Sequence, residues 1–236
     1  MGAQEFWWGA GVAKRDGFEN HIGLSDSQVQ ILSPPPMGKL ILIRHGETNN
    51  NLKNSLHASN DTELLNENGI KQIRITADKL SSLSPSIVYT SKEIRALESA
   101  KIISDTLKIP VEEIEGLQER NWGIFTGKSW KNVEKVLSKM TLDERYNYVP
   151  QGGESWKTFE TRLIDAIKRI SKKHENNNII IVTHGGAIRA LMPFLLGVSS
   201  EESFKYDPDN ASLTIFNFSE GNFIKEIIND TTHLSS

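Results

Sequence analysis

The stretch Lys-Leu-Ile-Leu-Ile-Arg-His-Gly at residues 39–46 decides the fold, because an uninterrupted apolar run ends abruptly in polar residues and a glycine. A short apolar run of this kind is typical of a strand that is buried on both faces, as in a parallel sheet. Residues 87–90 and 178–183 repeat the pattern, and residues 110–114 predict a shorter strand. The sequence therefore predicts a sheet with several buried parallel strands.

Helical periodicity separates these strands. Asn66 can cap a helix that runs to Leu83 with its apolar residues on one face. Further helices are predicted near residues 96–107, 130–137, 155–171 and 187–196, and two final strands at residues 211–218 and 222–228. Strands that alternate with helices form right-handed βαβ units. The predicted fold class is α/β, a three-layer α/β/α sandwich with a mainly parallel central sheet.

The first 36 residues differ from the rest of the chain. They show no sustained helical or strand period, and they end in Ser33-Pro34-Pro35-Pro36, which is typical of a linker. Met37 follows, immediately before the first predicted strand. We therefore expect residues 1–36 to be a non-native or disordered leader and residues 37–236 to be the working domain.

Composition excludes several classes of protein. Lys and Arg number 27 and Asp and Glu number 30, which gives a net charge of −3, and cysteine is absent. This charge gives no general attraction to nucleic acid or to an anionic membrane, and the lack of thiols rules out a cysteine nucleophile. No apolar run approaches the roughly 20 residues of a membrane span. We expect a soluble, cytoplasmic protein, and the sequence leaves its oligomeric state open.

Residues suited to binding an anion follow three of the predicted strands. Arg44 and His45 follow the first, Ser91 precedes Arg95 after the second, and His184 follows a third. Because the carboxyl ends of parallel strands meet at one edge of a sheet, we expect these residues to lie together. A guanidinium group suits a tetrahedral oxyanion such as phosphate, and a neutral imidazole can attack phosphorus. The set predicts phosphoryl transfer through a phosphohistidine.

Five blocks of the sequence resemble, in order, the histidine phosphatase superfamily, the phosphoglycerate mutase-like group, and specifically its phosphatase branch. The blocks are residues 42–48 with Arg44-His45-Gly46, 90–100 with Arg95, 117–123 with Glu119, 153–155, and 182–186 with His184. A lone Arg-His-Gly would be a weak signal, whereas five ordered blocks are a strong one. The resemblance implies a phosphoglycerate mutase-like fold and a small phosphorylated metabolite as the substrate.

The resemblance also implies a role for each matching residue. His45 would attack phosphorus, and Glu119 would act as general acid and base. The other predicted site residues, which would hold the phosphate oxygens, are Arg44, Thr48, Asn51, Arg95, His184 and Gly185. Neither a metal nor a cofactor is expected, because the arginines and His184 supply positive charge at the site.

We interpret the chain as a phosphatase of small phosphate monoesters. The segment between Glu119 and His184 is shorter than in cofactor-dependent phosphoglycerate mutases and carries no arginine pair, which would leave a phosphohistidine open to water. A 2,3-bisphosphoglycerate-dependent phosphoglycerate mutase is the alternative, followed by a non-catalytic protein that binds phosphorylated ligands. The loop after Asn51 also departs from the family pattern, because it lacks the usual arginine and proline.

Other polar and aromatic residues receive a structural interpretation. The remaining histidines have no partner histidine at a metal-binding spacing, and we expect them to be exposed or structural: His21, His57, His174 and His233. Three aromatic residues near the Glu119 block are expected in the core, with a place in the cleft wall as the alternative: Trp122, Phe125 and Trp130. Glu47 is expected either to line the site or to orient the arginines.

Overall fold

One sheet runs through the residues that the computed structural model describes, 37–57 and 61–235. The predicted leader at residues 1–36 lies outside them, as does His21, so both interpretations stay predictions. The strands are β1 (Gly38–Arg44), β2 (Ile87–Thr90), β3 (Val111–Glu113), β4 (Ile179–Thr183), β5 (Leu213–Ser219) and β6 (Asn222–Asp230). Their order in the sheet is β3-β2-β4-β1-β5-β6, and β5 runs against the other described strands.

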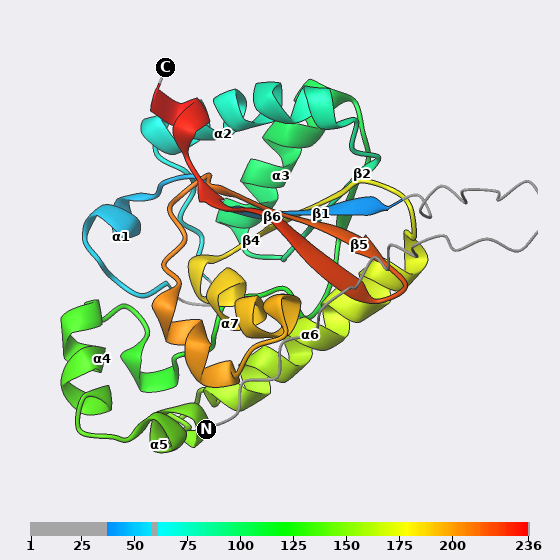
Figure 1. Ribbon diagram of the computed structural model, residues 1–236. Helices are drawn as coiled ribbons and strands as arrows, with labels where there is room; N and C mark the ends of the chain where they lie inside the picture. The colour runs from blue at the N-terminus through cyan, green and yellow to red at the C-terminus, as the bar shows by residue number, and fades with distance from the viewer. Residues whose placement is uncertain (1–36, 58–60, 236) are drawn as a thin grey trace, which may run out of the picture. The chain divides into compact units, whose positions relative to one another are not determined.

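Helices cover both faces of this sheet (Figure 1). On one face lie α2 (Glu67–Leu80) and α3 (Ile94–Leu107), and on the other α6 (Trp156–Lys173) and α7 (Gly185–Leu196). Shorter helices are α1 (Asn49–Leu52), α4 (Trp130–Leu137) and α5 (Leu142–Asn147), and 3₁₀ turns occupy Ser81–Leu83, Gly123–Phe125, Ser200–Lys205 and Thr232–Ser235. The predicted α/β three-layer sandwich with a mainly parallel sheet is confirmed.

The side chains of β1 alternate between two hydrophobic cores. Leu40 and Leu42 are fully buried in the core that contains α6 and α7, whereas Ile41 and Ile43 are fully buried in the core under α2 and α3. The strand β4 divides its isoleucines in the same way. Burial on both faces explains why these strands are apolar at consecutive positions, which is the pattern that predicts them.

The sequence analysis predicts the long elements and misses two short ones, α1 and α5. Each of these helices begins with a capping box, formed by Thr48 with Asn51 in α1 and by Thr141 with Glu144 in α5. Helices of four and six residues are too short to display an apolar period. The helix α7 also begins at Gly185, earlier than predicted, with His184 as its N-cap.

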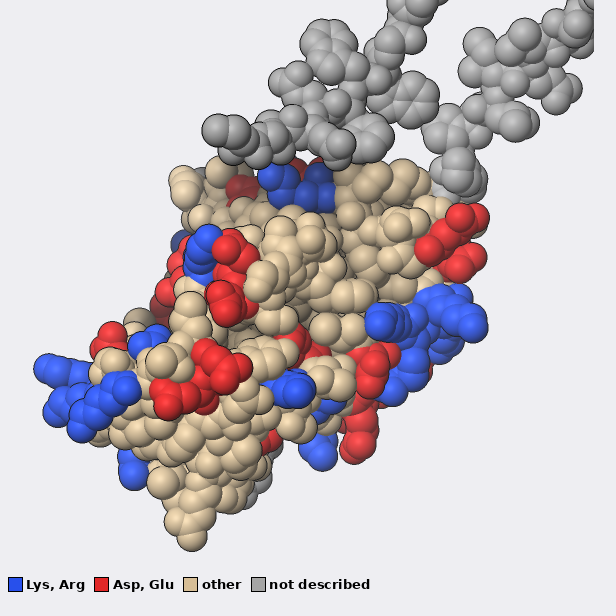
Figure 2. All heavy atoms as spheres, turned by 60° about the horizontal axis from the view of Figure 1, so that its bottom comes forward, with Lys and Arg blue, Asp and Glu red and all other residues tan. Residues whose placement is uncertain are grey.

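The surface carries charges of both signs. On the face shown in Figure 2, basic and acidic side chains lie beside one another in small groups, in keeping with the net charge of −3. Within the described part of the chain, no helix combines the length and the apolarity needed to cross a lipid bilayer. The expectations of a cytoplasmic location and of no nucleic-acid partner stay predictions.

Candidate active site

His45 lies at the carboxyl end of β1, where the chain leaves the sheet. The register of β1 with β4 pairs Arg44 with Thr183, and the His45 N–H donates to the Thr183 carbonyl oxygen at 2.9 Å. His45 therefore lies next to His184, with 5.3 Å between the two ring centroids. The parallel pairing of β1 and β4 thus brings together two histidines that are far apart in the sequence.

Among the described residues, one nitrogen of the His45 imidazole has a hydrogen-bond partner and the other has none. Its Nδ1 lies 2.8 Å from the Gly46 carbonyl oxygen, which can only accept, so Nδ1 carries the proton and Nε2 keeps its lone pair. Burial, together with the charges of Arg95, His184 and Arg44, holds the pKa of His45 well below 6.5. The ring is therefore neutral at pH 7, and a neutral imidazole with a free Nε2 is suited to attack phosphorus.

Two guanidinium groups beside His45 have N–H groups without partners. Arg95, in the first turn of α3, is 1% exposed, and its Nε and Nη1 have no hydrogen-bond partner among the described residues. Arg44 donates from Nη1 to the Pro208 carbonyl oxygen at 2.7 Å, but its buried Nε has no partner in the same set. A buried donor without a partner costs roughly 1–3 kcal/mol. An oxyanion bound next to His45 would satisfy these donors.

His184 is held by a buried carboxylate that the sequence analysis misses. Its Nε2 lies 3.1 Å from Glu93 Oε2 and 2.8 Å from Ser91 Oγ. His184 is 1% exposed and Glu93 2%. Although burial raises the pKa of Glu93, the charge and hydrogen bond of His184, with a bond from Ser91, lower it from 4.5 to about 2. The available signal was weak: an acidic residue at the start of the helix that follows Ser91.

Glu119 packs against the start of α7. Its Oε2 accepts from the Gly186 N–H at 2.9 Å, and its Oε1 accepts from the Arg120 N–H at 2.7 Å. Only a glycine leaves room for this carboxyl group, since a Cβ at position 186 would lie 2.3 Å from Glu119 Oε1. The N-terminus of α7 therefore fixes the carboxyl group at the pocket wall, which Gly185 also lines.

His57 lies inside the site, although the sequence analysis interprets it as exposed or structural. Its side chain is 7% exposed, it lines the pocket, and its ring centroid lies 5.9 Å from that of His45. Its Nδ1 lies 3.0 Å from Asp61 Oδ2. Burial and the charge of Arg95 lower the pKa of His57 from 6.5 to about 4, so the ring is neutral at pH 7. A single histidine in a polar loop has no periodicity that would indicate its burial.

Asn51 lines the pocket, whereas Thr48 is fully buried next to it. The Asn51 amide oxygen accepts from the Thr48 N–H and from the Asn210 amide, both at 3.1 Å, while its amide nitrogen lies 3.5 Å from His57 Nε2 and keeps a second N–H for a ligand. Thr48 thus positions Asn51, and its own predicted phosphate contact stays a prediction. Glu47 accepts from the Asn66 side chain at 2.9 Å rather than from an arginine.

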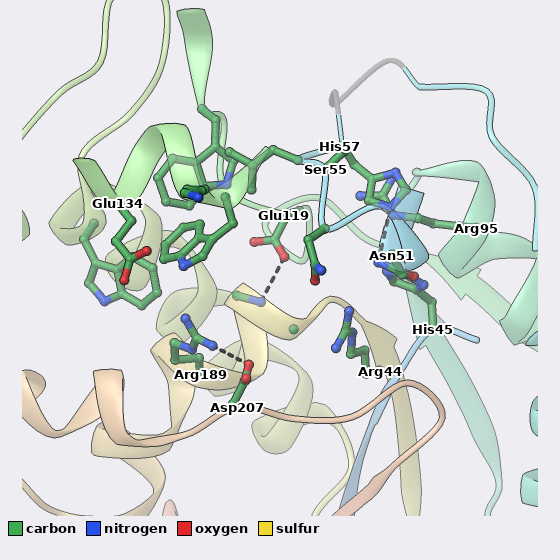
Figure 3. Close-up of a pocket in the computed structure, with 18 residues that line it drawn as sticks. Arg44, His45, Asn51, Ser55, His57, Arg95, Glu119, Glu134, Arg189 and Asp207 are labelled. Carbon is green, nitrogen blue, oxygen red and sulfur yellow. Dashed lines mark hydrogen bonds and ion pairs between the residues drawn. The ribbon is translucent and has the colours of Figure 1, made fainter. Parts of the chain in front are cut away.

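These side chains line one pocket of about 580 Å³ (Figure 3). Arg44, His45, Asn51, His57 and Arg95 gather at one end, Glu134, Arg189 and Asp207 lie at the other, and Glu119 lies between. Trp122 and Trp130 also line the pocket, while Phe125 is buried in the cluster beneath α4. The pocket has a cationic end that suits a phosphate group and a far end with charges of both signs.

Three groups near His45 could in principle hold a cation. The ligand atoms of His57, Asp61 and Glu63 lie within 4.8 Å of one another. The same atoms already have partners, since His57 Nδ1 pairs with Asp61 and Glu63 Oε1 accepts from the Asn50 N–H at 3.0 Å. Positive charge at this end of the pocket comes from Arg44 and Arg95, and the expected lack of a metal stays a prediction.

Comparison with known proteins agrees with this geometry. Residues 40–231 match the family model described as the histidine phosphatase superfamily, branch 1. The chain belongs to the histidine phosphatase superfamily. The resemblance drawn from the five sequence blocks is therefore confirmed.

Relatives of this histidine phosphatase carry the names of two activities. A metal-independent phosphoserine phosphatase of Arabidopsis thaliana is 33% identical over 84% of each chain. The structure of a phosphoserine phosphatase from Entamoeba histolytica in complex with 3-phosphoglyceric acid is 30% identical, with a TM-score of 0.75, over 84% of this chain and 100% of that one. A 2,3-bisphosphoglycerate-dependent phosphoglycerate mutase of Cytophaga hutchinsonii is 31% identical over 76% of this chain and 87% of that protein.

Proposed function

We propose that this histidine phosphatase hydrolyses phosphoserine, or a close analogue, through a phosphohistidine on His45. The observation that carries the proposal is the buried neutral ring of His45, with its proton on Nδ1, beside N–H groups of Arg44 and Arg95 that have no partner in the part of the chain that the structure describes. These groups can bind three oxygens of a phosphate and present the phosphorus atom to a nucleophile.

In the first step, Nε2 of His45 attacks phosphorus in line with the ester oxygen. The N–P bond forms while the P–O bond to the substrate breaks, and Glu119 donates a proton to the leaving oxygen. Arg44 and Arg95 stabilise the charge that develops on the other phosphate oxygens. The Gly46 carbonyl continues to accept from Nδ1–H, which stabilises the positive charge that the ring acquires.

In the second step, a water molecule attacks the phosphohistidine while the Glu119 carboxylate takes a proton from it. The N–P bond breaks, inorganic phosphate leaves, and His45 returns to its neutral form. Glu119 is protonated again, ready for the next substrate. Each group thus ends the cycle in the state in which it began.

The far end of the pocket supports an amino acid as the leaving group. Glu134, Arg189 and Asp207 lie at this end, where Arg189 pairs with Asp207, and Lys131, on α4 with Glu134, also lines the pocket. Serine carries an ammonium and a carboxylate group, and each would find a group of opposite charge. The relatives named as phosphoserine phosphatases support the same substrate class.

Phosphate release tests both parts of the proposal. L-phosphoserine, p-nitrophenyl phosphate, 3-phosphoglycerate and α-ribazole phosphate would be compared in the presence of EDTA. We expect the highest kcat/KM with L-phosphoserine, an acid-labile phosphoryl label on His45, and a loss of more than about 10⁴-fold in kcat in His45→Ala. Release that is fastest from another ester would contradict the substrate, whereas no release and no label would contradict the phosphatase.

Lys131 allows a sharper test of the substrate class. We expect Lys131→Ala to raise the KM for L-phosphoserine about threefold to fivefold, the effect of one exposed ion pair, without changing the KM for p-nitrophenyl phosphate. Lys135→Ala is the matched control, since Lys135 lies on the same helix, is also exposed, and does not line the pocket. Equal effects of the two substitutions would contradict recognition of the amino acid at this end.

A phosphoglycerate mutase is the second candidate, because one of the relatives carries that name. A mutase would convert 3-phosphoglycerate to 2-phosphoglycerate faster than it releases phosphate, after priming with 2,3-bisphosphoglycerate. We expect release to be the faster process, because the segment between Glu119 and His184 is short and carries no arginine pair.

A further inference from the structure

We propose that Glu93 is a positioning residue that holds a proton of His184 on Nε2 and so fixes the orientation of this imidazole next to the phosphoryl group. The proposal rests on the phosphoryl transfer proposed above. Three observations carry it: the contacts of Glu93, the burial of the pair, and the lack of a described partner for the other ring nitrogen of His184.

The contacts determine which nitrogen of His184 carries a proton. Glu93 Oε2 lies 3.1 Å from His184 Nε2, and a carboxylate can only accept a hydrogen bond. A proton on Nε2 makes this contact favourable, whereas a lone pair there would face the carboxylate and repel it. Ser91 Oγ, 2.8 Å from the same nitrogen, satisfies either arrangement, because a hydroxyl group both donates and accepts.

Any second proton on the ring must then reside on Nδ1. This nitrogen is buried and has no hydrogen-bond partner within residues 37–57 and 61–235. The ring lies edge-on to His45, with 5.3 Å between the centroids. A ring fixed at this place lies next to the phosphorus atom, where the transition state gathers negative charge on oxygen.

The surroundings of His184 make Glu93 the charged group that can accept a hydrogen bond from Nε2. Arg95 on α3, His45 after β1 and His57 after α1 also face the site, and none of them is negative. The Glu119 carboxylate is held by the Gly186 and Arg120 N–H groups. Glu93 and His184 are both nearly fully buried, so their attraction is weakly screened by water.

Glu93 also contacts both His184 and the backbone of Glu119, the proposed proton donor. Its second oxygen, Oε1, accepts from the backbone N–H of Glu119 at 3.1 Å. One buried carboxylate thus holds both the His184 ring and the backbone of the residue that protonates the leaving group. Loss of its charge should therefore affect the chemical step more than the binding of substrate.

Nitrogen NMR of the histidine rings tests the first part without any assay of activity. In ¹⁵N-histidine-labelled protein, with the His184 signal assigned from His184→Gln, we expect a proton on Nε2 at neutral pH, in the wild type and in Ser91→Ala alike. A His184 ring with its only proton on Nδ1 would overturn the proposal. This result would leave the phosphohistidine on His45 unaffected, so the two proposals can fail separately.

Kinetics of Glu93→Gln test the second part. We expect kcat to fall about 10- to 100-fold, less than the roughly 10²–10³-fold that accompanies removal of a whole oxyanion donor, with KM changed less than threefold. Glu113→Gln, which removes an exposed carboxylate from β3, is the matched control.

A Glu93→Gln enzyme with the wild-type kcat, or one whose KM changes as much as its kcat, would overturn the proposal. A purely structural role would lower the fraction of folded protein and leave kcat per folded molecule unchanged, so circular dichroism accompanies the kinetics. If Glu93→Gln does not fold, the NMR result on the wild type decides.

Discussion

Gly186 shows how closely a single residue controls the proposed proton donor. A Cβ at this position would lie 2.3 Å from Glu119 Oε1 and 2.9 Å from its Cδ, so an alanine must displace the carboxyl group. We expect Gly186→Ala to lower kcat about 10- to 100-fold, part of the 10²–10⁴-fold that general acid catalysis supplies. Initial rates with L-phosphoserine or p-nitrophenyl phosphate measure the effect.

A double-mutant cycle with Glu119→Ala separates this effect from a loss of stability. If Gly186→Ala acts through the carboxyl group, it should lower kcat only slightly in a Glu119→Ala background. The thermal midpoint should not fall, because Gly186 lies in the first turn of α7, where alanine is the better helix former. Equal losses of kcat in both backgrounds would show that the substitution disturbs something other than Glu119.

Residues at the ends of buried strands can be predicted from sequence, because strand geometry places them. Arg44, His45 and His184 follow apolar runs, and the parallel register brings them together. Glu93 and His57 could not be found in this way. Their burial depends on how a helix start and a polar loop fold back over the sheet edge, and neither has a pattern that differs from an exposed charge.

The helix α4 rests on a hydrophobic cluster of its own. Val133 and Leu137 point inward from α4 and pack with Trp122 and Phe125, apart from the two cores that hold the sheet. The apolar spacing on α4 predicts this helix from sequence. It does not predict where the helix packs, because a satellite cluster joins residues from turns without any period.

Because α4 packs on its own cluster, we expect this helix, which lines the pocket, to unfold locally while the sheet stays folded. We expect Leu137→Ala to lower the free energy of local unfolding by about 2–5 kcal/mol. Hydrogen exchange should rise over residues 122–148, while β1 and β4 stay protected. The KM for L-phosphoserine should rise, because Lys131 and Glu134 lie on the same helix. Hydrogen-exchange mass spectrometry measures this change in exchange peptide by peptide.

Leu163→Ala is the matched control for the core. Leu163 lies on α6 in the large cluster that packs against the sheet, so its loss should raise exchange in β1 and β4 as well. If Leu137→Ala raised exchange across the sheet to the same extent, α4 would belong to the same cooperative unit as the sheet.

The stability of the whole molecule depends on pH through three buried groups of the active site, because protonation of these groups destabilises the folded state. His45 and His57 are held neutral in the folded protein by burial and by the charge of Arg95. Glu93 is a carboxylate that His184 holds ionised, with a pKa of about 2 against an ordinary value of 4.5. All three groups therefore bind protons more readily in the unfolded chain than in the folded one.

The sign of the resulting pH dependence follows from linkage. The unfolded chain takes up a proton at His57 near pH 6.5, whereas the folded protein does so only near pH 4, so stability is full above pH 6.5 and is lost as the pH falls toward 4. Glu93 adds a further loss of stability between pH 4.5 and about 2.

We expect His57 alone to contribute about 1–3 kcal/mol to the loss of stability between pH 8 and 5. Urea unfolding at pH 8, 6.5 and 5 measures it, and His57→Gln, which cannot titrate, should unfold with a visibly smaller change over this range. A His57→Gln protein that loses as much stability as the wild type between pH 8 and 5 would show that this histidine is not held neutral by the fold.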